Sequence, residues 1–212
     1  SLSKGSLSPL LQSTEFGTNH EALAVMPKDH DDDHPLIVIG NNNAASSNGF
    51  SGPELLSGDA HVRMARLDDA NMLEPVRKWV VPGQGPIHAS VHPSFVATAN
   101  YVSGTIDVIQ RPMMDDNDND DKWNTRIIST DKVPSEMEFG GTMHSVTHDP
   151  IAAAAAEDEN FFLFGINAGV PSSVAVIQPT TGQILHTIPM PTRARRMTFH
   201  PTLPIVYMVY EK

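Results

Sequence analysis

The sequence has no cysteine among its 212 residues. It therefore has no disulfide framework, no thiolate metal ligand and no cysteine nucleophile, which is consistent with a reducing compartment. No apolar run reaches the roughly eighteen residues that a membrane-spanning helix needs. Residues 1–14 are rich in Ser and Leu but lack the basic start and apolar core of a secretory signal. We interpret 1–14 as a flexible tail and predict a soluble, cytoplasmic protein with no membrane partner.

Positive charge is also scarce. The chain has 14 Lys and Arg against 25 Asp and Glu, a net charge of -11. Binding to nucleic acid needs clustered cations that neutralise phosphates, so we predict no nucleic-acid partner. A hydrophobic content of 40% and a charged content of 18% are typical of a globular protein, and the length allows one domain with a sizeable core.

Several chemical motifs are missing. The sequence contains no nucleophile elbow, no phosphate-cradling glycine loop and no zinc-spaced His set. The acidic stretch 30–34 is contiguous, as in a solvated hairpin turn. The stretch 115–121 fails the calcium-loop pattern, because counting from Asp116 places Asp121 at the glycine position and Ile127 at the glutamate position. We predict no metal and no cofactor.

What the sequence does contain is a repeat. Three short apolar strands end in a polar residue and proline, and Pro93, Pro150 and Pro201 recur at intervals of 57 and 51 residues. A second apolar strand follows each proline, and a turn and two further strands follow in the units that are long enough. Strands of this length bounded by Gly, Pro and Asp predict an all-β fold. The first strands of the three units are Ala89–Pro93, Val146–Pro150 and Met197–Pro201. The second strands are Phe95–Asn100, Phe161–Asn167 and Ile205–Tyr210.

Four strands per repeat are typical of a β-propeller, whose blades are small antiparallel sheets. A β-sandwich with coincidental strand spacing is the alternative, and the recurring proline-ended strand favours blades. We predict blades at 15–84, 85–134 and 135–192, with a fourth starting at 193–212. About three and a half blades are thus present, and we interpret the chain as an N-terminal fragment, since propellers typically close with about four to eight blades.

The motifs resemble a known family. The segments are Gly85–Pro93, Ala99–Val108, Met143–Val146 and Ala194–Pro201 leading to Glu211. Together they resemble the early blades of the seven-bladed lactonase family, which includes propeller-type 6-phosphogluconolactonases and fungal carboxy-cis,cis-muconate cyclases. The chain departs from the family pattern in three respects. Arg196 stands where the family usually has His or Trp, 167–170 replaces a Leu-Gly-x-Asp turn, and long acidic insertions replace short turns.

The resemblance implies a site at the mouth of the central channel. It implies catalytic roles for His144, Arg195 and Glu211, and substrate binding by Arg196 and by His88, which is expected at the corresponding repeat position one blade earlier. A guanidinium binds carboxylate or phosphate in a fork geometry, His can move a proton near neutral pH, and Glu can orient or activate it. His88 could instead hold adjacent blades together by bonding to the backbone. The muconate cyclases use a further Arg from a later blade, which this sequence does not contain.

Other histidines have a simpler interpretation. His92, His148 and His200 flank the proline turns, and we expect them at blade corners rather than on a metal.

Three functions follow from the resemblance. The first is hydrolysis of a small anionic sugar lactone, as in the 6-phosphogluconolactonases. The alternatives are a carboxymuconate lactonising cycloisomerase and a non-catalytic propeller that binds a ligand. The sequence leaves the substrate and the oligomeric state open.

Overall fold

The computed structural model describes residues 20–25, 36–41, 60–67, 73–92, 94–110, 126–133, 143–150 and 161–211. These residues contain fourteen strands, and none of their helices is long and apolar enough to cross a membrane. The strands are β1 (His20–Val25), β2 (Leu36–Asn41), β3 (Ala60–Leu67), β4 (Leu73–Val81), β5 (Pro86–His92), β6 (Phe95–Asn100), β7 (Thr105–Gln110), β8 (Arg126–Ser129), β9 (Met143–His148), β10 (Leu163–Asn167), β11 (Ser173–Ile177), β12 (Ile184–Pro189), β13 (Ala194–Phe199) and β14 (Val206–Tyr210).

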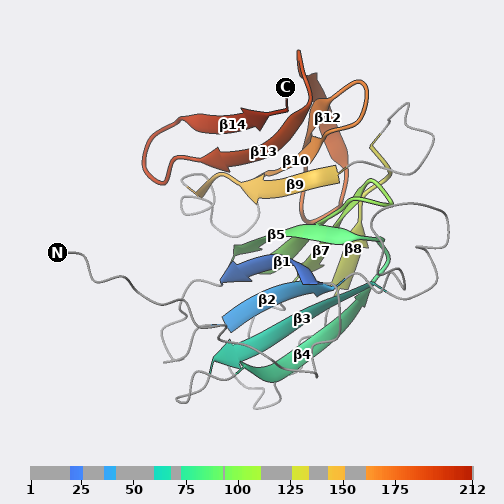
Figure 1. Cartoon of the computed structure of the whole chain (residues 1–212), viewed down its shortest axis with the longest axis vertical. Helices are drawn as coiled ribbons and strands as arrows, with labels where there is room; N and C mark the ends of the chain where they lie inside the picture. The colour runs from blue at the N-terminus through green and yellow to red at the C-terminus, as the bar shows by residue number, and fades with distance from the viewer. Residues whose placement is uncertain are drawn as a thin grey trace.

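The strands form three four-stranded sheets and one two-stranded sheet (Figure 1). Within each sheet every strand pairs antiparallel with its neighbour in the sequence, in the orders β1-β2-β3-β4, β5-β6-β7-β8, β9-β10-β11-β12 and β13-β14. This simple up-and-down order is the blade of a propeller. The predicted fold, about three and a half antiparallel blades, is confirmed.

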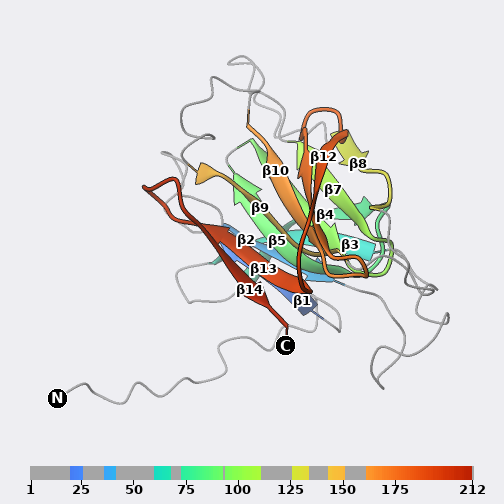
Figure 2. The same ribbon diagram turned by 90° about the horizontal axis from the view of Figure 1, so that it is seen from above.

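The blades stack through their first strands. β1 packs against β5, β5 against β9, and β9 against β13. In Figure 2 these first strands gather on one side of the stack, and β8 and β12 lie on the other. The first strands therefore form the inner side of the partial ring, where side chains of successive blades come together.

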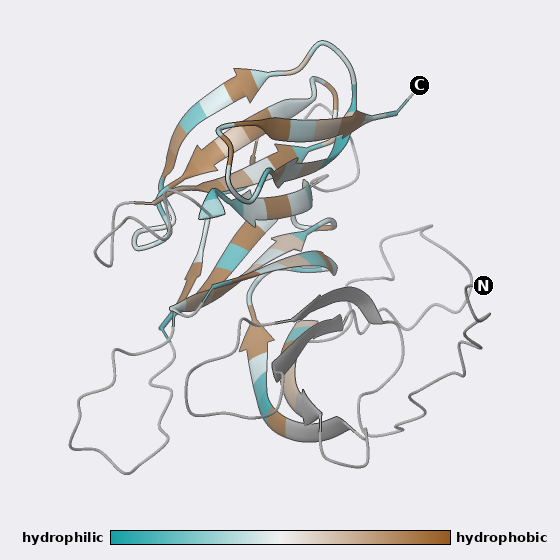
Figure 3. Ribbon diagram, turned by 90° about the vertical axis from the view of Figure 1, so that its left-hand side faces the viewer, coloured by the Kyte–Doolittle hydropathy of each residue, from teal (hydrophilic) through white to brown (hydrophobic). Residues whose placement is uncertain are grey.

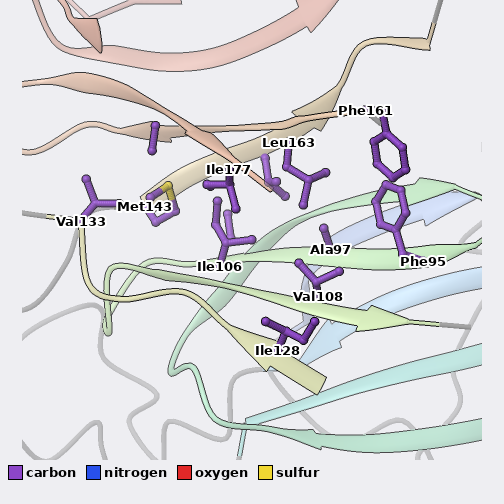
Figure 4. Packing of buried hydrophobic residues seen from close by; sticks show 13 residues of the cluster. Phe95, Ala97, Ile106, Val108, Ile128, Val133, Met143, Phe161, Leu163 and Ile177 are labelled. Carbon is purple, nitrogen blue, oxygen red and sulfur yellow. The ribbon is translucent and has the colours of Figure 1, made fainter. Parts of the chain in front are cut away.

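The core consists of apolar layers between blades. Figure 3 shows hydrophobic residues as brown bands along the strands. One layer joins the first and second blades around Val62 and Trp79. The next joins the second and third blades, with Ile106 against Met143, and is drawn in Figure 4. Fully burying one such side chain contributes about 1.5–3 kcal/mol, so each junction between blades has its own hydrophobic stabilisation. A third layer joins β13 and β14 to the third blade through Met197.

Gly165 allows the second and third blades to approach closely. A Cβ at this position in β10 would lie 2.3 Å from Cδ1 of Ile106 and 3.0 Å from Sδ of Met143. Such distances are shorter than van der Waals contact, so a side chain here would require Ile106 and Met143 to move or the two sheets to separate.

The first strands begin earlier than the apolar pattern predicts. β5, β9 and β13 each start three residues before the predicted strand, at Pro86, Met143 and Ala194. Backbone pairing continues past the apolar run because the hydrogen bonds of a sheet do not depend on side-chain polarity. His144 and Arg195 consequently lie inside strands.

The histidines beside the proline turns occupy blade corners. Nδ1 of His92 accepts the N–H of Ser94 at 3.3 Å, and Nδ1 of His200 accepts the N–H of Thr202 at 3.1 Å. His148, the last residue of β9, shares a hydrogen bond with a serine hydroxyl of β5. The imidazole thus closes a tight turn much as an Asx side chain does.

Other predictions lie outside the described residues. These are the tail 1–14 and the acidic stretches 30–34 and 115–121.

Candidate functional site

A β-bulge interrupts the start of each first strand. The residue left without a pairing partner is Glu21 in β1, Ile87 in β5, His144 in β9 and Arg195 in β13. A bulge turns the side chain of the extra residue away from the regular alternation, and bulges are frequent beside active sites. His144 and Arg195 therefore occupy equivalent positions on neighbouring blades.

His88 does not occupy the position that the sequence analysis gave it. The bulge of β5 lies at Ile87, so Ile87 is the register equivalent of His144, and His88 corresponds to Ser145 and Arg196. The expectation was wrong by one residue, because His88 lies five residues before its proline and His144 lies six. In a strand, a shift of one residue reverses the face on which a side chain lies.

Arg195 joins two of the predicted site residues. Its Nη1 bonds to Nε2 of His144, and its Nη2 donates to Oε2 of Glu211 at 2.7 Å. Because a guanidinium only donates, Nε2 of His144 must be the acceptor, and the proton of this imidazole lies on Nδ1. The Arg195 and Glu211 side chains are 28% and 40% exposed. The cluster is therefore partly open to solvent.

Arg193 adds a second cation to the same carboxylate. Its Nη1 lies 3.2 Å from Oε2 of Glu211, and its Nε donates to the carbonyl of Ala168 in the preceding blade at 3.0 Å. The backbone N–H of Glu211 also donates to the carbonyl of Arg193 at 2.8 Å. Glu211 is thus held at the end of β14 by backbone and side-chain bonds from β13 and the turn before it.

Arg196 and His88 both bond to the backbone of β9. Nη1 of Arg196 donates to the backbone carbonyl of His144. Nδ1 of His88 accepts the backbone N–H of Val146 at 3.4 Å. The bond from β5 to β9 and the bond from β13 to β9 hold both side chains against the central strand of the three.

The environment keeps both imidazoles neutral. Burial lowers the pKa of His144 to about 4, and the charges of Arg195, Arg196 and Arg193 act in the same direction while Glu211 opposes them. The pKa of His88 is also lowered to about 4, by burial and then by Arg196. Burial in a low-dielectric environment and a nearby positive charge both disfavour the charged imidazolium.

The same surroundings favour the charged form of the Glu211 carboxylate. The hydrogen bond from Arg195 lowers the pKa of Glu211, and the charges of Arg195 and Arg193 add to this. Glu211 is therefore ionised, and the three arginines leave the cluster with an excess of positive charge. In a chain with a net charge of -11, this is a local reversal of sign.

Tyr101 is a site residue that sequence reasoning missed. Its ring meets the ring of His144 edge-on, with centroids 5.0 Å apart and an interplanar angle of 72°. Its backbone N–H donates to the carbonyl of Gly85 at 2.7 Å. This bond is equivalent in the repeat to the bond from the Glu211 N–H to the Arg193 carbonyl. Gly85 has a φ of 69°, a conformation that other residues rarely adopt, so it is needed for this turn. The register equivalence of Tyr101 and Glu211 is the signal that could have identified it.

The structure brings all five predicted site residues together. His144, Arg195 and Glu211 form one hydrogen-bonded series, Arg196 bonds to the backbone carbonyl of His144, and the charge of Arg196 acts on His88. No group of three potential metal ligands occurs among the described residues. Their convergence makes the cluster the candidate site, and the role of each residue stays a prediction.

The fold is shared with solved structures. A candidate 6-phosphogluconolactonase from Bacteroides uniformis aligns with a TM-score of 0.58 and 15% identity, over 90% of this chain and 50% of that one. A second, from Bacteroides fragilis, gives the same values. No protein-family model and no curated protein sequence matches the chain. The chain spans half the length of these two structures, and at this identity the likeness establishes the fold, a partial β-propeller.

Proposed function

We propose that this site hydrolyses a small anionic lactone, most simply a phosphorylated sugar lactone. The observation that carries the proposal is the bonding of Arg195 to both His144 and Glu211. A cation, a neutral imidazole and a carboxylate are thereby within reach of one small molecule. The sequence motifs and the description of the two solved structures as candidate 6-phosphogluconolactonases support the same class.

Substrate binding follows from the surplus of guanidinium groups. A phosphate or carboxylate that enters beside Arg195 and Arg196 meets several N–H donors and a positive field. The substrate's negative charge offsets the arginine charges that depress the pKa of His144. His144 therefore becomes a better proton acceptor when the substrate is bound than when the site is empty.

The hydrolytic step then needs only water and these residues. As Arg195 turns toward the substrate, Nε2 of His144 becomes available to take a proton from a water molecule. The water oxygen bonds to the lactone carbonyl carbon, and Arg195 stabilises the negative charge that develops on the carbonyl oxygen. The ring C–O bond breaks as the tetrahedral intermediate collapses. The proton on His144 passes to the leaving alkoxide, which yields a hydroxy acid and restores the imidazole. Glu211 retains its bond to Nη2 of Arg195 while Nη1 leaves His144 for the substrate.

Lactonisation of a carboxymuconate is the second candidate. The joining of His144, Arg195 and Glu211 favours it, because these are the residue types that the resemblance implies for the muconate cyclases. There a substrate carboxylate would close the ring and one of these groups would deliver a proton to the adjacent carbon.

One experiment separates these functions. The purified protein is assayed for hydrolysis of 6-phosphogluconolactone above the protein-free rate, and for lactonisation of carboxymuconate. Replacing His144 with Ala should reduce the active reaction by roughly 10²–10⁴-fold. His186→Ala is the matched control, because His186 is exposed on β12. Turnover of neither substrate, with no effect of His144→Ala on any measured property, would leave only the binding module.

A further inference from the structure

The geometry points to an oxyanion-docking subsite formed by Arg196 and His88, distinct from the Arg193–Arg195–Glu211 cluster. It deepens the proposed function, on whose site it rests, by stating where the anionic group of the ligand binds. The ligand class that it predicts carries a carboxylate or phosphate in addition to the group that reacts beside His144.

The first argument is the distribution of counter-charge. Oε2 of Glu211 bonds to Arg195 at 2.7 Å and also lies 3.2 Å from Arg193. Arg196 bonds only to a neutral carbonyl, that of His144, and has no acidic partner in the part of the chain that the structure describes. Three guanidinium charges thus face one carboxylate. One surplus charge is shared by Arg193 and Arg195, whereas the charge of Arg196 has no carboxylate beside it in the described residues.

The second argument is that Arg196 is held in position. Its bond to the His144 carbonyl fixes one Nη and leaves Nε and the other Nη for a ligand. Arg196 is exposed, so a dissolved ligand can reach these donors, and partial burial and then the charge of Arg195 lower the pKa of its guanidinium. A cation in this condition is stabilised when an anion arrives, because the anion replaces lost hydration and offsets the repulsion.

The third argument is a neutral donor beside this cation. Because Nδ1 of His88 accepts the Val146 N–H, the proton of the imidazole lies on Nε2. Within the described residues Nε2 has no acceptor, and the charge of Arg196 acts on this ring. A neutral N–H and a guanidinium fork together match the several lone pairs of an oxyanion.

The position of the subsite also follows from the strands. His88 and Arg196 are register equivalents on β5 and β13. Both bond to the backbone of β9, on either side of Ser145: Arg196 to His144 and His88 to Val146. An anion that they hold lies beside the His144 imidazole. The docking group and the reacting group of the ligand are therefore separate but close, as in a small lactone or polycarboxylate that carries a charged substituent.

Binding of inert anions tests the subsite without turnover. Inorganic phosphate and succinate are titrated separately into the protein at pH 7 and low salt, and binding is followed by calorimetry. Two arms distinguish a phosphate ligand from a carboxylate ligand. Arg196→Gln should weaken binding of the preferred anion by roughly 10- to 100-fold, as expected for a lost charged hydrogen bond. His88→Asn, which retains an acceptor for Val146 but removes the Nε2 donor, should weaken it by about 2- to 10-fold.

The discriminating comparison is Arg193→Gln, which removes the same charge from the same site. Since Arg193 is already paired with Glu211, its loss should weaken binding by less than about fivefold. Arg196→Lys retains the charge without the fork and should give an intermediate affinity, which also covers the case in which Arg196→Gln fails to fold. Equal or larger losses for Arg193→Gln, or no binding of either anion by the wild type, would overturn the subsite. If Arg196→Gln abolishes anion binding but no lactone is turned over, the subsite stands and the proposed hydrolysis fails.

Discussion

His88 should make the unfolding free energy of this protein depend on pH. Burial, followed by the charge of Arg196, lowers the pKa of His88 to about 4 in the folded state. In the unfolded chain the imidazole titrates near 6.5. Between these values the unfolded chain binds a proton that the folded chain does not, so the stability is complete above about pH 6.5 and is lost as the pH falls toward 4.

The size of this effect follows from the two pKa values. Each pKa unit corresponds to about 1.36 kcal/mol, and about one and a half units separate pH 5 from the unfolded pKa. His88 is mostly buried, so little of this is lost to solvent screening. We expect His88 to lower the unfolding free energy by about 2 kcal/mol between pH 7 and pH 5.

His88→Asn removes the titration and keeps an acceptor for the Val146 N–H. Urea unfolding, followed through the fluorescence of the buried Trp79, should show that the variant loses about 2 kcal/mol less than the wild type between pH 7 and pH 5. The other histidines with lowered pKa values are the same in both proteins and cancel in this difference. His186→Asn on the exposed strand should behave as the wild type. Equal losses in His88→Asn and the wild type would refute the burial of a neutral imidazole at this position.

Two further predictions concern the packing around the site. Gly165→Ala places a Cβ 2.3 Å from Cδ1 of Ile106, so it should lower the unfolding free energy by about 1–3 kcal/mol. Adding Ile106→Val should recover part of this loss, and urea unfolding measures both changes. A Gly165→Ala variant as stable as the wild type would contradict the close approach of the blades. Tyr101→Leu should raise the pKa of His144 toward its ordinary value because the imidazole becomes less buried, whereas Tyr101→Phe should leave this pKa near 4. An NMR titration of His144 distinguishes the two variants. Equal effects of both would rule out the ring contact as the cause.

The second strands of the blades follow closely from the sequence. The predicted bounds of β6, Phe95–Asn100, are those of the structure, and β14 begins one residue after its predicted start at Ile205, because mostly apolar residues fill these strands. The first strands are different. Their first three residues mix polar and apolar side chains around a bulge, so the apolar pattern begins three residues too late. Tertiary placement, not strand propensity, decides where β5, β9 and β13 begin.

The candidate site is predictable only in part. His144, Arg195 and Glu211 were identified through the resemblance of their motifs, and the structure joins them. Tyr101 was not identified because its contact with His144 crosses from one blade to the next, and only its equivalence with Glu211 in the repeat could have indicated it. His88 was assigned by counting along the repeat, and the bulge at Ile87 makes such counting wrong by one residue.

The bulges also explain how unlike blades assemble one site. All four first strands share the backbone irregularity at the same distance from the turn, and the residue that each places there differs. Where the bulge residue is His144 or Arg195, the blade contributes a side chain to the candidate catalytic cluster. Where it is Ile87, the second blade contributes instead through Tyr101, which follows β6, and through His88 at the junction with β9. The candidate chemistry thus spans the β9–β13 junction, and the candidate anion site also depends on the β5–β9 junction. Substitutions that shift one blade against the next, such as Gly165→Ala, should therefore alter the pKa of His144 without touching any site residue.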